Sequence, residues 1–133
     1  MKQIVSPGSR MGLRLNMEIF KDFTVESAHF LPNAPEGHKC RRLHGHSFKI
    51  GIHVSGELSV DSGWVIDFGD ISKAFAPLHA VLDHCLLNEV EGLSNPTSEN
   101  ISIWIWHRLK PALPGLCKVV VHETCTSGCT YTE

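Results

Sequence analysis

The residues from 44 to 55 alternate between two kinds of side chain, and this alternation constrains the possible folds more than any other feature of the sequence. One parity begins with two histidines and continues with apolar residues only: His44, His46, Phe48, Ile50, Ile52 and Val54. The other parity carries glycines and polar residues. A period of two is typical of a β-strand, whose successive side chains point to opposite faces. The sequence therefore predicts a half-buried strand whose inward face starts with both histidines.

The start of this strand carries candidate metal ligands. His44 and His46 share the inward face, and Cys40 lies four residues upstream of the first histidine. Two neutral imidazoles on one face suit Zn²⁺, which takes nitrogen and sulfur ligands. Either histidine alone is better explained as a core residue bonded to a backbone carbonyl, but the pair beside a thiol favours a metal site.

A preceding segment, Met17 to Phe30, supplies a third histidine. It has the same period of two, interrupted at Lys21, and His29 ends its apolar face. If this strand pairs antiparallel with the one that starts at His44, the end of the first lies beside the start of the second. Three histidines then converge on one face. Three protein ligands with an open fourth position are typical of a catalytic rather than a structural zinc ion.

The connection between these strands, Leu31 to Leu43, is long for a hairpin, and long loops in compact domains are often functional. Cys40 lies within it, beside Lys39, Arg41 and Arg42. Cationic neighbours and a nearby metal would lower the pKa of the Cys40 thiol and favour its thiolate. A charged loop broken by prolines is a poor setting for the alternative, a small buried cysteine that only packs.

The middle of the chain predicts two helices. Asp67 can cap the first, whose apolar stripe runs from Phe68 to Leu82. Pro77 lies inside that stripe and is expected to kink or end the helix. Either Asn95 or Thr97 can cap the second helix.

Two further places carry candidate chemistry. Asp83 and His84 follow the first helix directly, and a carboxylate beside an imidazole suits an orienting or proton-relay pair. Glu123 has the apolar parity of a predicted third strand, Leu116 to Thr124, where carboxylates rarely lie unpaired. Either the strand has ended and Glu123 lies in solvent, or Glu123 is a preorganised anion for a planar ligand with adjacent N–H donors. A short edge strand is expected over 129–132.

Composition fits one domain in a reducing compartment. The chain has 133 residues, 42% of them hydrophobic, and a net charge of −2, which argues against a broad nucleic-acid or membrane surface. An odd number of cysteines, five, without an apolar leader favours free thiols, so we expect a cytoplasmic protein. Residues 1–16 are expected to form a loose N-terminal leader and residues 17–133 a single catalytic domain.

Several motifs resemble the family of 6-pyruvoyltetrahydropterin synthase and 6-carboxytetrahydropterin synthase, from about Phe20 to Tyr131. They are Ser27-Ala28-His29, Cys40-x-x-x-His44-Gly45-His46, Leu82-Asp83-His84, Pro96-Thr97-Ser98-Glu99-Asn100 and Glu123-Thr124. The motif with two histidines, together with the upstream histidine, is the specific one, and the others support it by their order.

The resemblance implies a chemical role for most of these motifs. Zn²⁺ would be held by His29, His44 and His46. Cys40 would be the base that abstracts a proton, and Asp83 with His84 would assist as a relay.

The resemblance also implies how the substrate is bound. Glu123 would anchor the pterin ring, and Thr97, Ser98 and Glu99 would form a second segment in contact with it. The basic residues around Cys40, which are Lys39, Arg41 and Arg42, are expected to meet the triphosphate.

The implied fold is the α+β tunnelling fold, or T-fold, a four-stranded antiparallel sheet with two helices packed on one face. Three subunits would join their sheets into a barrel, and two trimers would stack into a homohexamer. Barrel closure would also remove exposed sheet edges.

The implied activity is that of a lyase of queuosine biosynthesis. The segment around Cys40 and the end of the chain look most like the bacterial enzyme that converts 7,8-dihydroneopterin triphosphate to 6-carboxy-5,6,7,8-tetrahydropterin, releasing acetaldehyde and triphosphate. One alternative is the pyruvoyl-forming enzyme of biopterin synthesis. An alternative of another class is a non-catalytic binding module in which Cys40 completes a structural Cys-His₃ zinc site.

Overall fold

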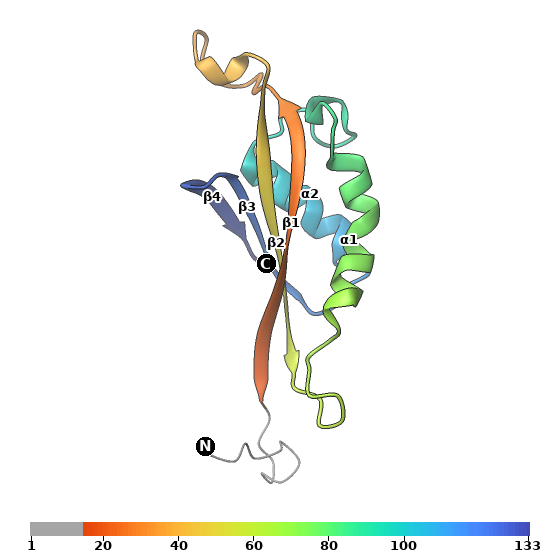
Figure 1. Ribbon diagram of the computed structural model, residues 1–133. Coiled ribbons are helices and arrows are strands. Elements are labelled where there is room, and N and C mark those ends of the chain that lie inside the picture. Colours follow the sequence, from red (N-terminus) through yellow and green to blue (C-terminus); the bar gives the residue numbers. More distant parts are fainter. Residues whose placement is uncertain (1–14) are drawn as a thin grey trace.

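The computed structural model describes residues 15–133 (Figure 1). Its strands and α-helices are β1 (Asn16–His29), β2 (His44–Glu57), α1 (Phe68–Leu82), α2 (Ser98–Leu109), β3 (Leu116–Thr124) and β4 (Ser127–Tyr131). Two short 3₁₀ helices, η2 (Lys39–Arg41) and η3 (Leu87–Glu89), lie in the connections. The elements thus follow the order that the sequence predicts, with the last strand beginning two residues earlier and ending one residue earlier than expected.

The four strands form one antiparallel sheet in the order β1-β2-β3-β4. Figure 1 shows both α-helices on the same face of this sheet. The inward parity of the first two strands faces the helices, as the alternation in their sequences requires. The expected four-stranded antiparallel sheet with two helices on one face is therefore confirmed.

The core lies between the helices and the inward face of the sheet. Its fully buried members on the strands and helices include Val25, Phe48, Ile50, Ile52, Val119, Val121, Ile71, Phe75, Ile101 and Ile105. Burying one such side chain contributes about 1.5–3 kcal/mol. This packing, rather than the loops, holds the ends of β1 and β2 in register.

Both helices begin at predicted caps. The Asp67 carboxylate accepts a hydrogen bond from a backbone N–H two residues on (2.8 Å), and the Thr97 hydroxyl accepts one from three residues on (3.0 Å). Pro77 does not end α1, which continues to Leu82. Pro77 is exposed, and buried neighbours on either side of it, Phe75 and Leu78, keep the helix packed on the core.

β1 and β4 are the edge strands of the sheet. The segment after α1 covers one end of the β1 edge, where the N–H of Ala28 donates to the carbonyl of Cys85 (2.9 Å) and Ala28 forms a parallel bridge with Leu86. Within residues 15–133, no other strand pairs with the outer edge of β1 or β4. Open edges of this kind favour pairing with another chain.

The first described strand begins inside the segment that the sequence assigns to a loose leader. Asn16 already pairs with Glu57, and the carbonyl of Leu15 accepts a hydrogen bond from the N–H of Leu58 (2.8 Å). The rest of the expected leader, residues 1–14, lies outside the described residues. In the part of the chain that follows, no helix is long and apolar enough to span a membrane.

Candidate functional site

One end of the β1–β2 pair brings three histidines together, as the sequence predicts. His29 lies opposite His44 in the strand register, and His46 lies opposite Ser27. One ligand atom from each of the three side chains lies within 4.8 Å of the others. His29 is fully buried, whereas His44 and His46 are half-buried. The convergence follows directly from antiparallel pairing of two strands with histidines on their inward faces.

Backbone carbonyls orient two of the three rings. Nδ1 of His29 lies 2.8 Å from the carbonyl oxygen of Pro96, and Nδ1 of His44 lies 2.7 Å from that of Arg42. A carbonyl oxygen can only accept a hydrogen bond, so each Nδ1 carries the proton and each Nε2 keeps its lone pair. Proteins use the same arrangement to aim histidines at a metal ion.

The remaining ring nitrogens fit a bound cation. Nε2 of His29 and Nε2 of His46 are buried and have no hydrogen-bond partner. Burial lowers the pKa of both histidines below the ordinary value of 6.5, which favours the neutral form that ligates metals. A buried polar group without a partner costs about 1–3 kcal/mol, and coordination would remove that cost. Three imidazoles are a donor set that Zn²⁺ accepts.

Cys40 lies in η2, in a pocket of about 610 Å³ that His44 and His46 also line. The His38 ring accepts a hydrogen bond from the backbone N–H of Cys40 (3.0 Å), and the Cys40 carbonyl accepts one from Leu31 (2.8 Å). The backbone on both sides of the thiol is therefore fixed. Among residues 15–133, the cluster that could hold a metal does not include Cys40, so the thiol is a neighbour of the cluster and not a member of it.

Glu123 lies within β3 and not beyond its end. β3 continues to Thr124, and the Glu123 side chain is 28% exposed. Its Oε2 lies 3.7 Å from Nε2 of His29 and 3.8 Å from Nε2 of His46. Both distances exceed those of hydrogen bonds, so the carboxylate lies beside the ligand atoms without being bonded to them. The structure thus excludes the interpretation in which the strand ends early and Glu123 extends freely into solvent.

Glu123 lines three pockets in the described part of the chain. The smallest, of about 340 Å³, is lined by Glu123 and by the segment with Thr97, Ser98 and Glu99. The second is the pocket that holds Cys40, and it shares Glu123 and Ser127 with the first. The third, of about 670 Å³, is lined by Glu123, His46 and Lys49 among others. One ligand could therefore extend from the α2 end into the Cys40 pocket, passing the carboxylate and the histidines on its way.

Asp83 and His84 form a pair at the edge of β1. Oδ2 of Asp83 lies 2.7 Å from Nδ1 of His84. Glu26 of β1 holds both residues, since its N–H donates to the Asp83 carboxylate (2.8 Å) and its carbonyl accepts from the N–H of His84 (2.6 Å). The hydrogen bond from the Glu26 N–H, with a smaller effect of the His84 ring, lowers the pKa of Asp83, so that this carboxylate stays charged.

The structure does not bring this pair to the other candidate residues of the same chain. Neither Asp83 nor His84 lines the pockets that contain Cys40 and Glu123. The His84 side chain is 77% exposed. The pair is thus accessible to a neighbouring molecule, whereas the histidines, Cys40, Glu123 and the start of α2 form one continuous site.

Sequence reasoning missed the groups that position the candidate residues. They include the His38 ring, the carbonyls of Pro96 and Arg42, and the backbone of Glu26. A backbone carbonyl has no side-chain signature, so nothing in the sequence singles out Pro96 or Glu26. His38 did carry a signal, because a polar ring two residues before Cys40 is well placed to accept a local backbone N–H.

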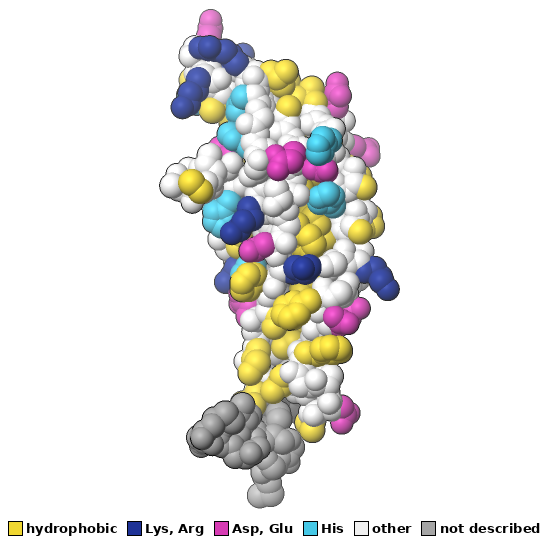
Figure 2. All heavy atoms as spheres, viewed as in Figure 1, with side chains coloured by type: hydrophobic (Ala, Val, Ile, Leu, Met, Phe, Trp, Pro, Cys, Tyr) yellow, Lys and Arg dark blue, Asp and Glu magenta, His cyan; other side chains and the backbone are white. Residues whose placement is uncertain are grey.

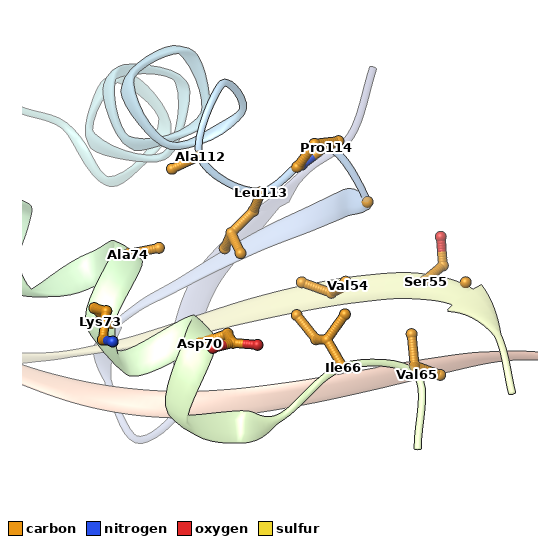
Figure 3. Close-up of a pocket in the computed structure, with 12 residues that line it drawn as sticks. Val54, Ser55, Val65, Ile66, Asp70, Lys73, Ala74, Ala112, Leu113 and Pro114 are labelled. Atoms are coloured by element: carbon orange, nitrogen blue, oxygen red, sulfur yellow. The ribbon is translucent and has the colours of Figure 1, made fainter. Parts of the chain in front are cut away.

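Another pocket, of about 670 Å³, lies toward the opposite end of β2 from the histidines. Figure 3 shows its apolar lining, with Val54 from β2, Ile66 before α1 and Leu113 after α2, and with Asp70 and Lys73 of α1 beside it. Its lining contains no histidine or cysteine. This pocket therefore offers neither an imidazole nor a thiol for the chemistry predicted at the histidine end of the sheet.

Curated proteins similar to this chain include pterin synthases. A protein of Synechocystis named 6-carboxy-5,6,7,8-tetrahydropterin synthase is 45% identical over 119 residues, which cover 85% of this chain and 91% of the relative. A Bacillus subtilis protein of the same name is 34% identical over 128 residues, covering 87% and 85%. The human 6-pyruvoyl tetrahydrobiopterin synthase is 34% identical over 98 residues, covering 69% and 63%.

Solved structures and family models give the same result. The structure of Caenorhabditis elegans 6-pyruvoyl tetrahydropterin synthase superimposes with a TM-score of 0.82 at 24% identity, covering 91% of this chain and 99% of that one. This likeness confirms the expected T-fold. The family model described as 6-pyruvoyl tetrahydropterin synthase matches residues 18–133. With nearly all the described residues matched, the chain belongs to the 6-pyruvoyl tetrahydropterin synthase family.

Proposed function

We propose that this chain is a lyase that converts 7,8-dihydroneopterin triphosphate to 6-carboxy-5,6,7,8-tetrahydropterin, with release of acetaldehyde and triphosphate, as a step of queuosine biosynthesis. The observation that carries the proposal is a three-histidine cluster beside Cys40 and Glu123 in a chain 45% identical over 119 residues to a protein named for that product. The reaction needs a base near carbon-bound protons that have been made acidic. A metal ion on the cluster would acidify such protons, and the Cys40 thiolate would be the base.

Zn²⁺ is the metal that we propose for His29, His44 and His46. When bound, zinc supplies Lewis acidity toward substrate oxygens and stabilises negative charge that develops beside them. The protein contributes the geometry of the ligands. The carbonyls of Pro96 and Arg42 hold two of the rings, so their Nε2 atoms need no reorientation to bind the ion.

Cys40 is the proposed general base. Its backbone is fixed on both sides, which limits the positions that the thiol can reach within the pocket it shares with His44 and His46. As thiolate it would take a proton from the substrate side chain. Asp83 and His84 would then carry that proton onward, with the charged carboxylate stabilising the imidazolium.

The relay requires a second subunit. Asp83 and His84 lie at the β1 edge and outside the Cys40 pocket, so we infer that they serve the pocket of a neighbouring chain. Pairing between the open edges of β1 and β4 would build trimers, and two trimers would form the hexamer. This assembly is proposed to act in the cytoplasm.

The similarity to the human relative supports a second candidate activity. The human relative named for the pyruvoyl product is also 34% identical, although over only 63% of its own length. Formation of 6-pyruvoyl tetrahydropterin from the same substrate is therefore the alternative activity. The structural Cys-His₃ site of a binding module has less support, because within the described residues Cys40 is not among the clustered ligands.

Product identification separates these possibilities. We expect zinc-loaded protein incubated with 7,8-dihydroneopterin triphosphate to yield the mass of the carboxy product together with acetaldehyde. The mass of the pyruvoyl compound without acetaldehyde would assign the alternative activity. Unchanged substrate, with zinc and fold intact, would contradict both enzymatic assignments.

Glu123→Ala is expected to weaken pterin binding by roughly 2–5 kcal/mol, because a preorganised carboxylate that accepts parallel N–H bonds is lost. Isothermal titration with a non-phosphorylated pterin measures the effect, and metal analysis establishes that zinc is retained beside the changed residue. Glu89→Ala, which removes the same charge from an exposed position outside these pockets, is the matched control. Unchanged affinity in the Glu123 variant would rule out its role as the pterin anchor.

A further inference from the structure

The three basic residues around Cys40 do not have the same task. Figure 2 shows Lys and Arg side chains gathered at the tip of the molecule, over the β1–β2 connection. Within it, Nη1 of Arg41 donates to the carbonyl of Pro32 (3.0 Å) and to that of Ala34 (2.8 Å). Both carbonyls belong to the same loop, so Arg41 closes the loop on itself. Nη1 of its guanidinium is committed to this brace.

Lys39 and Arg42 are placed differently. Both line the pocket that contains Cys40, His44 and His46, and Arg41 does not. Within residues 15–133, neither the Lys39 ammonium nor the Arg42 guanidinium has a hydrogen-bond or ion-pair partner, and both residues are exposed. Their positive charges are therefore open to a ligand in that pocket.

The surroundings do not neutralise these charges. From residue 37 to residue 56 the sequence contains no Asp or Glu. The one carboxylate that lines the pocket is Glu123, which lies beside the histidine ligand atoms. The pocket thus has an anionic wall toward the pterin side and a cationic wall toward the loop, which suits a ligand with a cationic or N–H-rich end and an anionic end.

Two of the pockets that Glu123 lines, the one at the start of α2 and the one that holds Cys40, indicate the order of the ligand's parts. A ring held between Glu123 and the start of α2 would direct its side chain past the histidines into the Cys40 pocket. The far end of that side chain then arrives between Lys39 and Arg42. In the proposed substrate this end is the triphosphate.

We propose that Lys39 and Arg42 form the triphosphate-binding site, while Arg41, which does not line their pocket, holds the loop that carries them. This inference deepens the proposed function and rests on it. Polyanionic phosphates are bound most strongly by charge-assisted hydrogen bonds, and the planar guanidinium of Arg42 can contact two oxygens at once. The sequence-based expectation that all three basic residues meet the triphosphate is narrowed to two.

Binding of inorganic tripolyphosphate to zinc-loaded protein tests the site without turnover. We expect Arg42→Gln and Lys39→Gln each to raise the Kd of tripolyphosphate about tenfold or more, as for a lost hydrogen bond between charged groups. Arg42→Lys keeps the positive charge but loses the forked pair of N–H donors, so its Kd for tripolyphosphate should lie between those of wild type and Arg42→Gln. Lys73→Gln removes the same charge near the distant pocket and should leave the Kd unchanged. All variants retain the three histidines, so any zinc–phosphate contact is common to them.

A second ligand makes the outcomes distinguishable. The affinity for 7,8-dihydroneopterin, which lacks phosphate, should be the same in wild type and in both variants. If tripolyphosphate binds equally well to wild type, Arg42→Gln and Lys39→Gln, the phosphate site is wrong while the proposed function stands. If tripolyphosphate does not bind to the wild-type protein at all, the phosphate site is wrong as well. If the wild-type protein does not turn over the proposed substrate but the variants lose tripolyphosphate, the proposed function fails and a phosphate site on this loop stands.

Discussion

Replacing His44 by alanine is expected to remove the bound metal and the activity together. The His44 ring is held at Nδ1 by the carbonyl of Arg42 (2.7 Å), which leaves Nε2 as one of three converging ligands. Without it only two protein ligands remain, fewer than catalytic zinc sites use. Metal analysis of the purified variant should therefore fall from about one zinc per chain to nearly none, and no product should form.

His53→Ala is the matched control, because it lies on the same strand with the opposite parity. Its ring contacts Glu18 (2.8 Å) on the face away from the cluster. This variant should keep zinc and turnover. A His44→Ala protein with full zinc would contradict the metal assignment. Zinc loss in both variants would also contradict the assignment of the metal to His44 specifically. Circular dichroism of both variants shows whether such a loss comes from general unfolding.

The histidine cluster could be predicted because two independent regularities meet there. A period of two places His44 and His46 on the inward face, and antiparallel pairing places His29 beside them. Neither step depends on exact turn geometry. The helices were predictable for a similar reason, since an apolar stripe and a capping side chain are both local features of the sequence.

The Asp83-His84 pair could not be placed in the same way. Its position depends on a residue with a left-handed backbone, His84 at φ 55, and on two hydrogen bonds to the backbone of Glu26, 57 and 58 residues away. A tertiary contact of this range has no periodic signature. The same holds for the Pro96 carbonyl that orients His29, 67 residues away. The sequence thus suggested the chemical groups of the site, while long-range backbone contacts determine their orientation.

Cys40→Ala should lose turnover by about 10²–10⁴-fold or more, as expected when a general base is removed, yet keep its zinc and its fold. Zinc is retained because the metal cluster of the described residues does not include the thiol. Cys117→Ala, which changes a half-buried cysteine outside the pocket, is the control and should remain active. If Cys40→Ala instead loses zinc and unfolds, Cys40 is a structural ligand and the binding-module alternative is correct.

The inactive Cys40→Ala protein also provides a test of the site shared between subunits. His84→Ala should be nearly inactive as well, because the relay lacks its imidazole. The two substituted positions lie in separate parts of the fold. His84 is 77% exposed at the β1 edge, and Cys40 lies inside its pocket. When the two variants are mixed under conditions that exchange subunits, some interfaces combine an intact Cys40 with an intact His84.

Activity should then reappear in the mixture. For equal amounts and random exchange, about one quarter of the interfaces carry both intact residues, which sets the highest recovery relative to wild type. Exchange itself is verified by mass spectrometry of oligomers in which one variant is isotopically labelled. If Cys40 and His84 served the same site from one chain, every site would retain one lesion and mixing would restore nothing. Recovery near one quarter supports the shared site, and complete exchange without recovery contradicts it while leaving the zinc assignment intact.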